Sequence, residues 1–292
     1  MTTIIKERLK ALDSITLQRG AHDPNGDKQF SAMEAAAWIA GEEHSGHPKC
    51  VSPVLAAFMR ALNDALDDEA RQALKPYIPR VIGTAGDGHD EERSWMAVDW
   101  LARVCAPAWL GLAGINDSAE ALRSLPPITE ATLAEAQPTV EAARKKAAAA
   151  WAAAGGAARD AVWDAAWDAA WDAAWTAAGA ATAGAAAARD AARDVVWDAA
   201  RDAVWDAAWV AALEAEKQGG GSGAIKECFA PVKAELHRSA HHLLDCMIDG
   251  SERKLHDLRP DLASGRGLPE RGEARRVRKA GRRIRRTPEG RA

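Results

Sequence analysis

This sequence has few aromatic residues apart from tryptophan: three phenylalanines and one tyrosine accompany twelve tryptophans among 292 residues. Eight of the tryptophans fall between Trp151 and Trp209. Hydrophobic residues make up 48% of the chain, but a large part of them is alanine, which buries little area per residue. This composition excludes an ordinary, evenly packed enzyme over the second half of the chain.

The sequence also lacks segments that would carry a protein into or across a membrane. Met1 to Asp13 is charged and contains no continuous apolar run of the kind that a signal peptide needs. The Trp- and Ala-rich stretch is long enough to cross a bilayer, but it carries an aspartate at almost every fourth position. Each aspartate would cost about 2.5–3.5 kcal/mol at the membrane centre, so we expect no membrane span.

Cysteine is scarce, and the familiar catalytic motifs are missing. The four cysteines lie far apart in the sequence, and without an export signal we expect reduced thiols in a cytoplasmic protein. We find no Walker loop, nucleophile elbow, dinucleotide-binding fingerprint or paired-histidine protease helix. The sequence therefore gives no reason to expect an enzyme.

The formal net charge of −4 is unevenly distributed along the chain. Arg266 to Ala292 contains eleven basic and three acidic residues, a charge of +8, so the remainder carries −12. Such a tail either folds back on its acidic body or binds the phosphates of a nucleic acid without sequence specificity. No aromatic residue is interleaved for base stacking. The basic cluster consists of Arg275, Arg276, Arg278, Lys279, Arg282, Arg283, Arg285 and Arg286.

Residues 1–127 are predicted to form a compact helical head domain. Ser31 and Glu34 make a capping-box pattern that opens a helix, which should end near Gly41. Ser52-Pro53 is a second start signal, because serine caps the helix and proline suits the first helical position.

The later part of the head domain gives weaker signals. A short helix should end at Lys75-Pro76, and the apolar run Tyr77–Ile82 is interpreted as extended or irregular. Gly83–Gly88 is predicted to be a loop. The helix after it should reach Pro107 or bend there, and Leu125–Pro127 marks the domain boundary.

Residues 128–218 are dominated by alanine and by a four-residue unit, seen in Trp163-Asp-Ala-Ala and its repeats. Alanine is the best helix former, so the sequence predicts helices here. Four residues turn an α-helix by about 400°, and each successive tryptophan therefore lies about 40° further round the axis. Between Trp163 and Trp175 the stripe drifts by about 120°, which remains one broad face.

The simplest arrangement of the repeats is an antiparallel hairpin, with one helix over about 157–178 and another over about 185–217. Residues 219–224 are predicted to be a flexible Gly/Ser linker. Residues 225–250 should form a closing amphipathic helix, and 251–292 a disordered basic tail. The predicted fold class is therefore all-α.

Three segments have distinctive sequences: Met33–Phe58, which contains Gly41-Glu-Glu-His-Ser-Gly-His47-Pro-Lys-Cys50, then Ile78–Gly88 and Leu243–Ile248. Together they resemble a family of uncharacterised bacterial and phage proteins. That family joins such a head domain to Ala-rich tetrapeptide repeats and a closing helix. The resemblance covers about residues 1–250 and implies this architecture, but it implies no catalytic residue.

The sharpest local cluster of potential metal ligands is His44-x-x-His47-x-x-Cys50. Imidazole and thiolate both bind zinc, and a structural site needs a fourth ligand. The candidates for that ligand are Glu43, His89 and Cys105. The alternative, which we favour, is an interhelical loop in which Cys50 packs as a small hydrophobe.

A second group of possible ligands lies on the predicted closing helix. His242 and Cys246 share one face, and His237 and His241 share another, so these residues and Cys228 cannot all bind one ion. We therefore favour a packed or surface helix.

Two further patterns have both a functional and a structural interpretation. The loop Gly83–Gly88 could present backbone amides to a phosphate, but Asp87 and the acidic residues after it would repel an anion, so we favour helix capping. The aspartates of the repeats could mimic a nucleic-acid backbone. Interleaved arginines argue against this, and a solvated helix face is favoured.

These observations predict a non-catalytic interaction or regulatory protein that binds a protein partner, or itself, through the repeat helices, because aromatic residues dominate such interfaces. The competing interpretation is that the same rings dock on the head domain. The alternatives are a nucleic-acid-associated protein acting through its tail, and a zinc protein or enzyme built on His44, His47 and Cys50. The predicted partner contacts are Trp163, Trp167, Trp171, Trp175, Trp197, Trp205 and Trp209.

Overall fold

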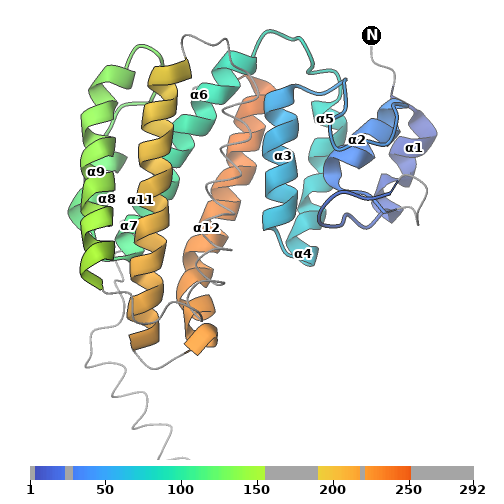
Figure 1. Ribbon diagram of the computed structural model, residues 1–292. Helices are drawn as coiled ribbons and strands as arrows, with labels where there is room; N and C mark the ends of the chain where they lie inside the picture. Colours follow the sequence, from blue (N-terminus) through green and yellow to red (C-terminus); the bar gives the residue numbers. More distant parts are fainter. Residues whose placement is uncertain (1–3, 24–28, 155–189, 218–220, 251–292) are drawn as a thin grey trace, which may run out of the picture. The chain divides into compact units, whose positions relative to one another are not determined.

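The computed structural model describes four stretches of the chain, residues 4–23, 29–154, 190–217 and 221–250 (Figure 1). Within them the protein is all α-helical, as predicted, with one isolated β-bridge between Leu17 and Phe30 and no strand. A search of the described helices finds none with the length and apolar character of a membrane span.

The described helices, in chain order, are α1 (Lys6–Ala11), α2 (Ala32–Ala40), α3 (Pro53–Ala65), α4 (Asp68–Arg71), α5 (Ile78–Val81), α6 (Asp90–Trp100), α7 (Ala106–Leu112), α8 (Asn116–Arg123), α9 (Leu133–Ala154), α11 (Asp190–Lys217) and α12 (Gly221–Asp249). Two 3-10 helices, η1 (Leu12–Ser14) and η2 (Gln72–Tyr77), and one π-helical segment, η3 (Leu101–Cys105), lie between them.

The helix starts predicted from capping residues are confirmed. Ser31 caps α2, and its backbone N–H donates to the Glu34 carboxylate at 2.8 Å, which completes the capping box. α2 ends at Gly41, whose φ of 76° lies in the left-handed region that favours glycine. Ser52 caps α3 by accepting a hydrogen bond from the backbone of Leu55.

The prediction for Tyr77–Ile82 was wrong over Tyr77–Val81, which is helical, and only Ile82 has an extended backbone. The 3-10 helix η2 continues through Pro76 to Tyr77, and α5 follows directly from Ile78. Pro79 lies in the first turn of α5, where the missing N–H of a proline would have no partner in any case. Burial of Ile78 and Val81 then holds this short turn against the core.

The helix that precedes Pro107 neither stops nor breaks at that residue. The π-helical segment η3 joins α6 to α7, and Pro107 lies in the first turn of α7. A π-segment changes the hydrogen-bond register, so the proline enters where its missing N–H is tolerated. The result is a nearly continuous helical run from Asp90 to Leu112.

α12 lies antiparallel to this run, and the two share one core. Arg93 contacts Met247, the Trp100 indole N–H donates to the Ser239 hydroxyl at 2.9 Å, and Trp109 lies 4.9 Å from Phe229 between ring centroids. The buried residues form a single continuous cluster from the head segment through α12. The expected boundary at Leu125–Pro127 is therefore a connection between segments that share a core.

α9 and α11 lie side by side and run in the same direction (Figure 1). Trp151 of α9 meets Trp209 of α11, while Arg144, two turns earlier on α9, acts electrostatically on Asp202 and Asp206. The predicted helix over 157–178 lies outside the described residues.

The described chain also differs from the predicted linker. α12 begins at Gly221, inside the expected linker 219–224, so that only residues 218–220 separate α11 from α12. Ile225, in the first turns of α12, is fully buried and packs in the core.

Candidate functional site

Three of the seven tryptophans predicted to contact a partner are described, all on α11. Trp197 and Trp209 are buried, with 6% and 2% of their surface exposed, and Trp205 is partly buried. The Trp209 ring lies 5.1 Å from Trp151 and 6.5 Å from Trp205 between centroids. Trp197 and Trp209 therefore belong to the chain's own core rather than to a surface open to a partner.

The remaining predicted interaction residues lie outside the described residues. They are Trp163, Trp167, Trp171 and Trp175 of the repeats, and all eight arginines and lysines of the basic tail cluster.

Trp151, Trp205 and Trp209 form a tryptophan cluster where α9 faces α11. Charged side chains of the two helices form a rim beside this cluster. Arg144 donates two hydrogen bonds of 2.8 Å to Glu141 on its own helix. Burial, and then the charge of Asp202, raise the pKa of Asp206 to about 6. Because Asp206 is partly buried, the charge at this rim changes near pH 6.

His44, His47 and Cys50 do not form the zinc cluster that was the less favoured interpretation of their spacing. Burial, with help from Glu42, raises the pKa of the Cys50 thiol to about 12. Arg60 lowers the pKa of His47. Among the described residues no group of three or more His, Cys, Asp or Glu side chains could hold a metal ion. Cys50 packs in the core, as the alternative interpretation expected.

His44 instead takes part in a cluster that the sequence did not indicate. The buried carboxylate of Glu34 accepts hydrogen bonds from the backbone and ring of His22 at 2.9 and 2.7 Å, and His44 Nε2 lies 3.4 Å away. Although burial alone would raise the pKa of Glu34, hydrogen bonds from Ser31 and His22 hold it below its ordinary value. The capping box identified Glu34 as a capping residue. His22 reaches it from a loop, and no local sequence pattern predicts that contact.

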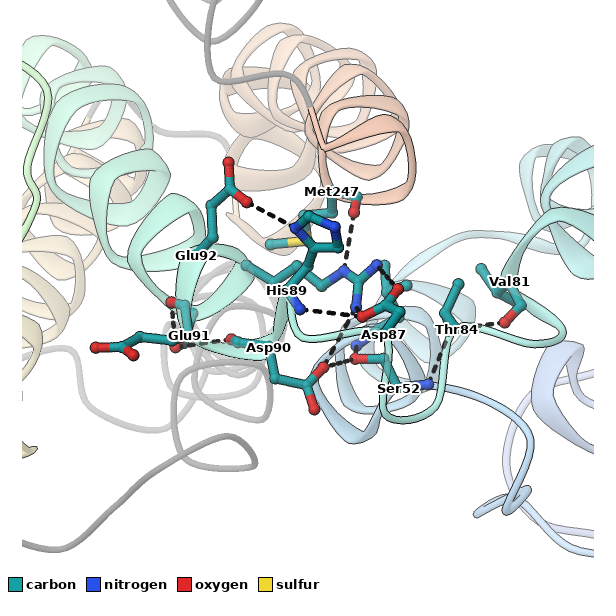
Figure 2. Close-up of polar contacts among 12 residues, drawn as sticks. Ser52, Val81, Thr84, Asp87, His89, Asp90, Glu91, Glu92 and Met247 are labelled. Carbon is teal, nitrogen blue, oxygen red and sulfur yellow. Dashed lines mark hydrogen bonds and ion pairs between the residues drawn. The ribbon is translucent and has the colours of Figure 1, made fainter.

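The Gly83–Gly88 loop is held by intramolecular contacts (Figure 2). Asp87 accepts two hydrogen bonds, of 2.8 and 2.6 Å, from the guanidinium of Arg93, which also lies 3.3 Å from Asp90. Asp90 in turn accepts a hydrogen bond from the Ser52 hydroxyl. Although burial alone would raise the pKa of Asp87, the Arg93 bonds keep it low. The carboxylates therefore join the starts of α3 and α6, which agrees with a structural rather than a phosphate-binding role.

A buried ion pair on α6 and η3 is a second feature that sequence reasoning missed. Arg103 donates to Asp99 at 2.6 and 3.0 Å and to the carbonyl of Leu125 at 2.9 Å. Asp99 also accepts from the backbone N–H of Ile128 at 2.7 Å. The (i, i+4) spacing of the two charges could have suggested the pair, but their contacts with residues 125–128 depend on the tertiary fold.

His237 and His241 of α12 face residues 1–127. Burial, followed by the charge of Lys233, lowers the pKa of His237 to about 4. Burial also lowers the pKa of His241, whose ring lies 5.6 Å from Tyr77. Neutral, partly buried imidazoles fit the packed helix that we favoured over a metal site.

Comparisons with protein-family models, with curated proteins and with solved structures find no match for this chain. Its function has to be inferred from the arrangement of its own residues.

Proposed function

We propose that this protein is a non-catalytic interaction protein of bacterial or phage origin, which binds a protein partner or a second copy of itself through its repeat segment. The observation that carries the proposal is the Trp151–Trp209 contact, which fixes α9 and α11 to each other at one end of the segment. Both helices belong to one continuous core. A segment whose two ends are fixed on a folded base loses less freedom on binding than a free chain does.

Composition supports this assignment. The segment between α9 and α11 carries Trp163, Trp167, Trp171 and Trp175 in 13 residues, and tryptophan is the residue type most enriched among energetically important contacts at interfaces. Since Trp197 and Trp209 serve the core, the partner contacts that we propose are these four rings together with Trp205 at the edge of the base.

The cysteines support a reducing compartment, and we propose the cytoplasm. No disulfide joins the four cysteines, and Cys50, Cys105 and Cys246 are buried. Cysteines without disulfides are typical of proteins that remain in a reducing environment.

The test compares the full chain with a variant in which the four repeat tryptophans are replaced by alanine, which preserves helix propensity. A matched control replaces Asp164, Asp168 and Asp172 by asparagine, so that the charge changes and the rings remain. Affinity capture from the source organism and light scattering of the purified protein measure partner binding and self-association. We expect both to depend on the rings, and a capture or mass that is unchanged in the alanine variant would overturn the proposal.

A further inference from the structure

Arg60 on α3 carries a partly buried charge that the described residues do not balance. Its guanidinium donates a hydrogen bond of 2.9 Å to the backbone carbonyl of Gly46, and it forms no ion pair with a described carboxylate. Arginines removed from water are ordinarily paired, as Arg71, Arg93 and Arg103 are in this protein. Because a guanidinium has several N–H groups, most of the donors of Arg60 are left for another molecule.

Asp64, one turn after Arg60 on α3, attracts the guanidinium but is bonded elsewhere. Its carboxylate accepts hydrogen bonds from the backbone N–H of Gly20 at 2.9 Å and from the side-chain amide of Asn63 at 3.0 Å. Burial lowers the pKa of Arg60, and the charge of Asp64 only partly opposes that effect. The desolvated guanidinium therefore favours a ligand that brings its own negative charge.

The loop before α3 places further donors next to the guanidinium. The carbonyl that Arg60 binds belongs to the peptide between Gly46 and His47, and the stem of Arg60 passes 3.5 Å from where a Cβ on Gly46 would lie. Ser45 Oγ accepts from the backbone N–H of His47 at 3.0 Å, so its O–H proton is available to donate. The His47 side chain is exposed, and the charge of Arg60 is the main cause that lowers its pKa. A guanidinium, an imidazole and a hydroxyl thus gather at one peptide.

These donors fit a phosphate group better than a carboxylate. A guanidinium binds two oxygens of an oxyanion through parallel N–H bonds, which uses both oxygens of a carboxylate. A phosphate has a further acceptor oxygen for the imidazole and the hydroxyl. The nearby Glu42 is occupied, because it accepts a hydrogen bond of 2.6 Å from the backbone of Lys49, whose side chain is exposed and adds positive charge.

We propose that Arg60, His47 and Ser45 form a site that binds a phosphate group, either as the free ion or at the end of a phosphomonoester. Arg60 binds two oxygens of the phosphate, and the His47 ring and the Ser45 hydroxyl bind a third. The site lies within residues 1–127 and involves none of the repeat tryptophans, so it stands or falls independently of the proposed function.

The first test is an NMR titration of the full chain at constant pH and ionic strength. Inorganic phosphate replaces chloride, and the side-chain Nε–H of Arg60 and the ring of His47 report binding. We expect saturable shifts with phosphate and much weaker ones with acetate. Binding of O-phosphoserine as well would indicate a phosphomonoester ligand, and binding of inorganic phosphate alone would indicate the free ion. Shifts that do not saturate, or that acetate reproduces, overturn the proposal.

The second test measures phosphate affinity in two variants and a control. Arg60→Lys keeps a charge and a donor for the Gly46 carbonyl but loses the paired N–H groups, and His47→Ala removes an exposed ring that folding does not require. We expect each variant to weaken binding by about tenfold. Arg80→Met, which removes an arginine already paired with two aspartates, should leave binding unchanged. Unchanged affinity in either of the first two variants, or an equal loss in the control, overturns the proposal.

Discussion

Arg93 is almost completely buried, yet it donates hydrogen bonds to Asp87 and to the carbonyl of Met247, and it lies close to Asp90. Removing one partner of a buried ion pair leaves the other groups desolvated without a partner, which costs about 3–5 kcal/mol. Because Asp87 keeps some contact with water, we expect Arg93→Met to lower the free energy of unfolding by about 3 kcal/mol. Urea denaturation measures the change.

Arg80 supplies the matched control for this prediction. It also reaches α12, through Asp245 at 2.5 Å and Asp249 at 3.0 Å, but all three side chains are more than one third exposed. Exposed pairs contribute about 0–1 kcal/mol, so Arg80→Met should have a much smaller effect. Equal losses in the two variants would show that burial is not the reason for the importance of Arg93.

Asp206 gives a prediction about pH. Its pKa of about 6 in the folded protein exceeds the ordinary value of 3.8, so ionisation opposes folding, and this penalty is present above about pH 6 and absent below about pH 4. We expect Asp206→Asn to raise the free energy of unfolding by about 1–2 kcal/mol at pH 7, after allowance for solvent screening, and to leave it unchanged at pH 4. Chemical denaturation at both pH values measures this.

Asp198 is the control carboxylate on the same helix. Its side chain is 56% exposed and pairs with Arg201 at 2.8 Å. Asp198→Asn should therefore bring no gain in stability at pH 7. The explanation for Asp206 fails if the two variants show the same pH dependence.

At the scale of elements, the buried pair Asp99–Arg103 determines how α9 leaves the helix formed by α6, η3 and α7. It holds the carbonyl of Leu125 and the N–H of Ile128 just before α9 begins. Asp99→Asn removes the charge that balances Arg103, and we expect a loss of about 3 kcal/mol in the free energy of unfolding. Hydrogen exchange should become faster at Ile128 and in the first turn of α9.

Ser239→Ala tests whether that exchange effect is local. It removes the hydrogen-bond partner of the Trp100 indole, which faces α12 rather than the connection to α9. An unsatisfied buried N–H costs about 1–3 kcal/mol, so this variant should also be destabilised, but Ile128 should exchange as in the wild type. Faster exchange at Ile128 in both variants would indicate general loosening of the bundle.

The helices differ in how far local sequence could predict them. α2 and α3 begin at capping residues, and capping depends on groups within one turn, so Ser31 and Ser52 were sufficient. α5 was missed because prolines dominate its local signal, whereas burial of Ile78 and Val81 against distant residues decides its conformation. Where capping residues are present, neighbouring residues predict that a helix begins. Where they are absent, tertiary contacts decide whether the segment is helical.

At the scale of the whole molecule, the charge of +8 between Arg266 and Ala292 against −12 elsewhere is the strongest asymmetry. If the tail binds nucleic acid, affinity should fall with salt along a log–log slope of about −0.9 for each phosphate contact with duplex DNA. We expect deletion of 266–292 to abolish this salt-sensitive binding, measured by fluorescence anisotropy with labelled duplex DNA. Binding that survives the deletion would exclude the tail as its source.

The amino-acid sequence by itself determined the helical class, the capped starts of α2 and α3, and the absence of a membrane-length apolar run. Each of these depends on residues a few positions apart, whose propensities and charges act locally. Only the tertiary structure showed that α9 and α11 are parallel, that Trp197 and Trp209 serve the core, and that Glu34 gathers His22 and His44. Those contacts depend on which surfaces, distant in the sequence, pack together and exclude water. The spacing of residues along the chain does not predict that packing.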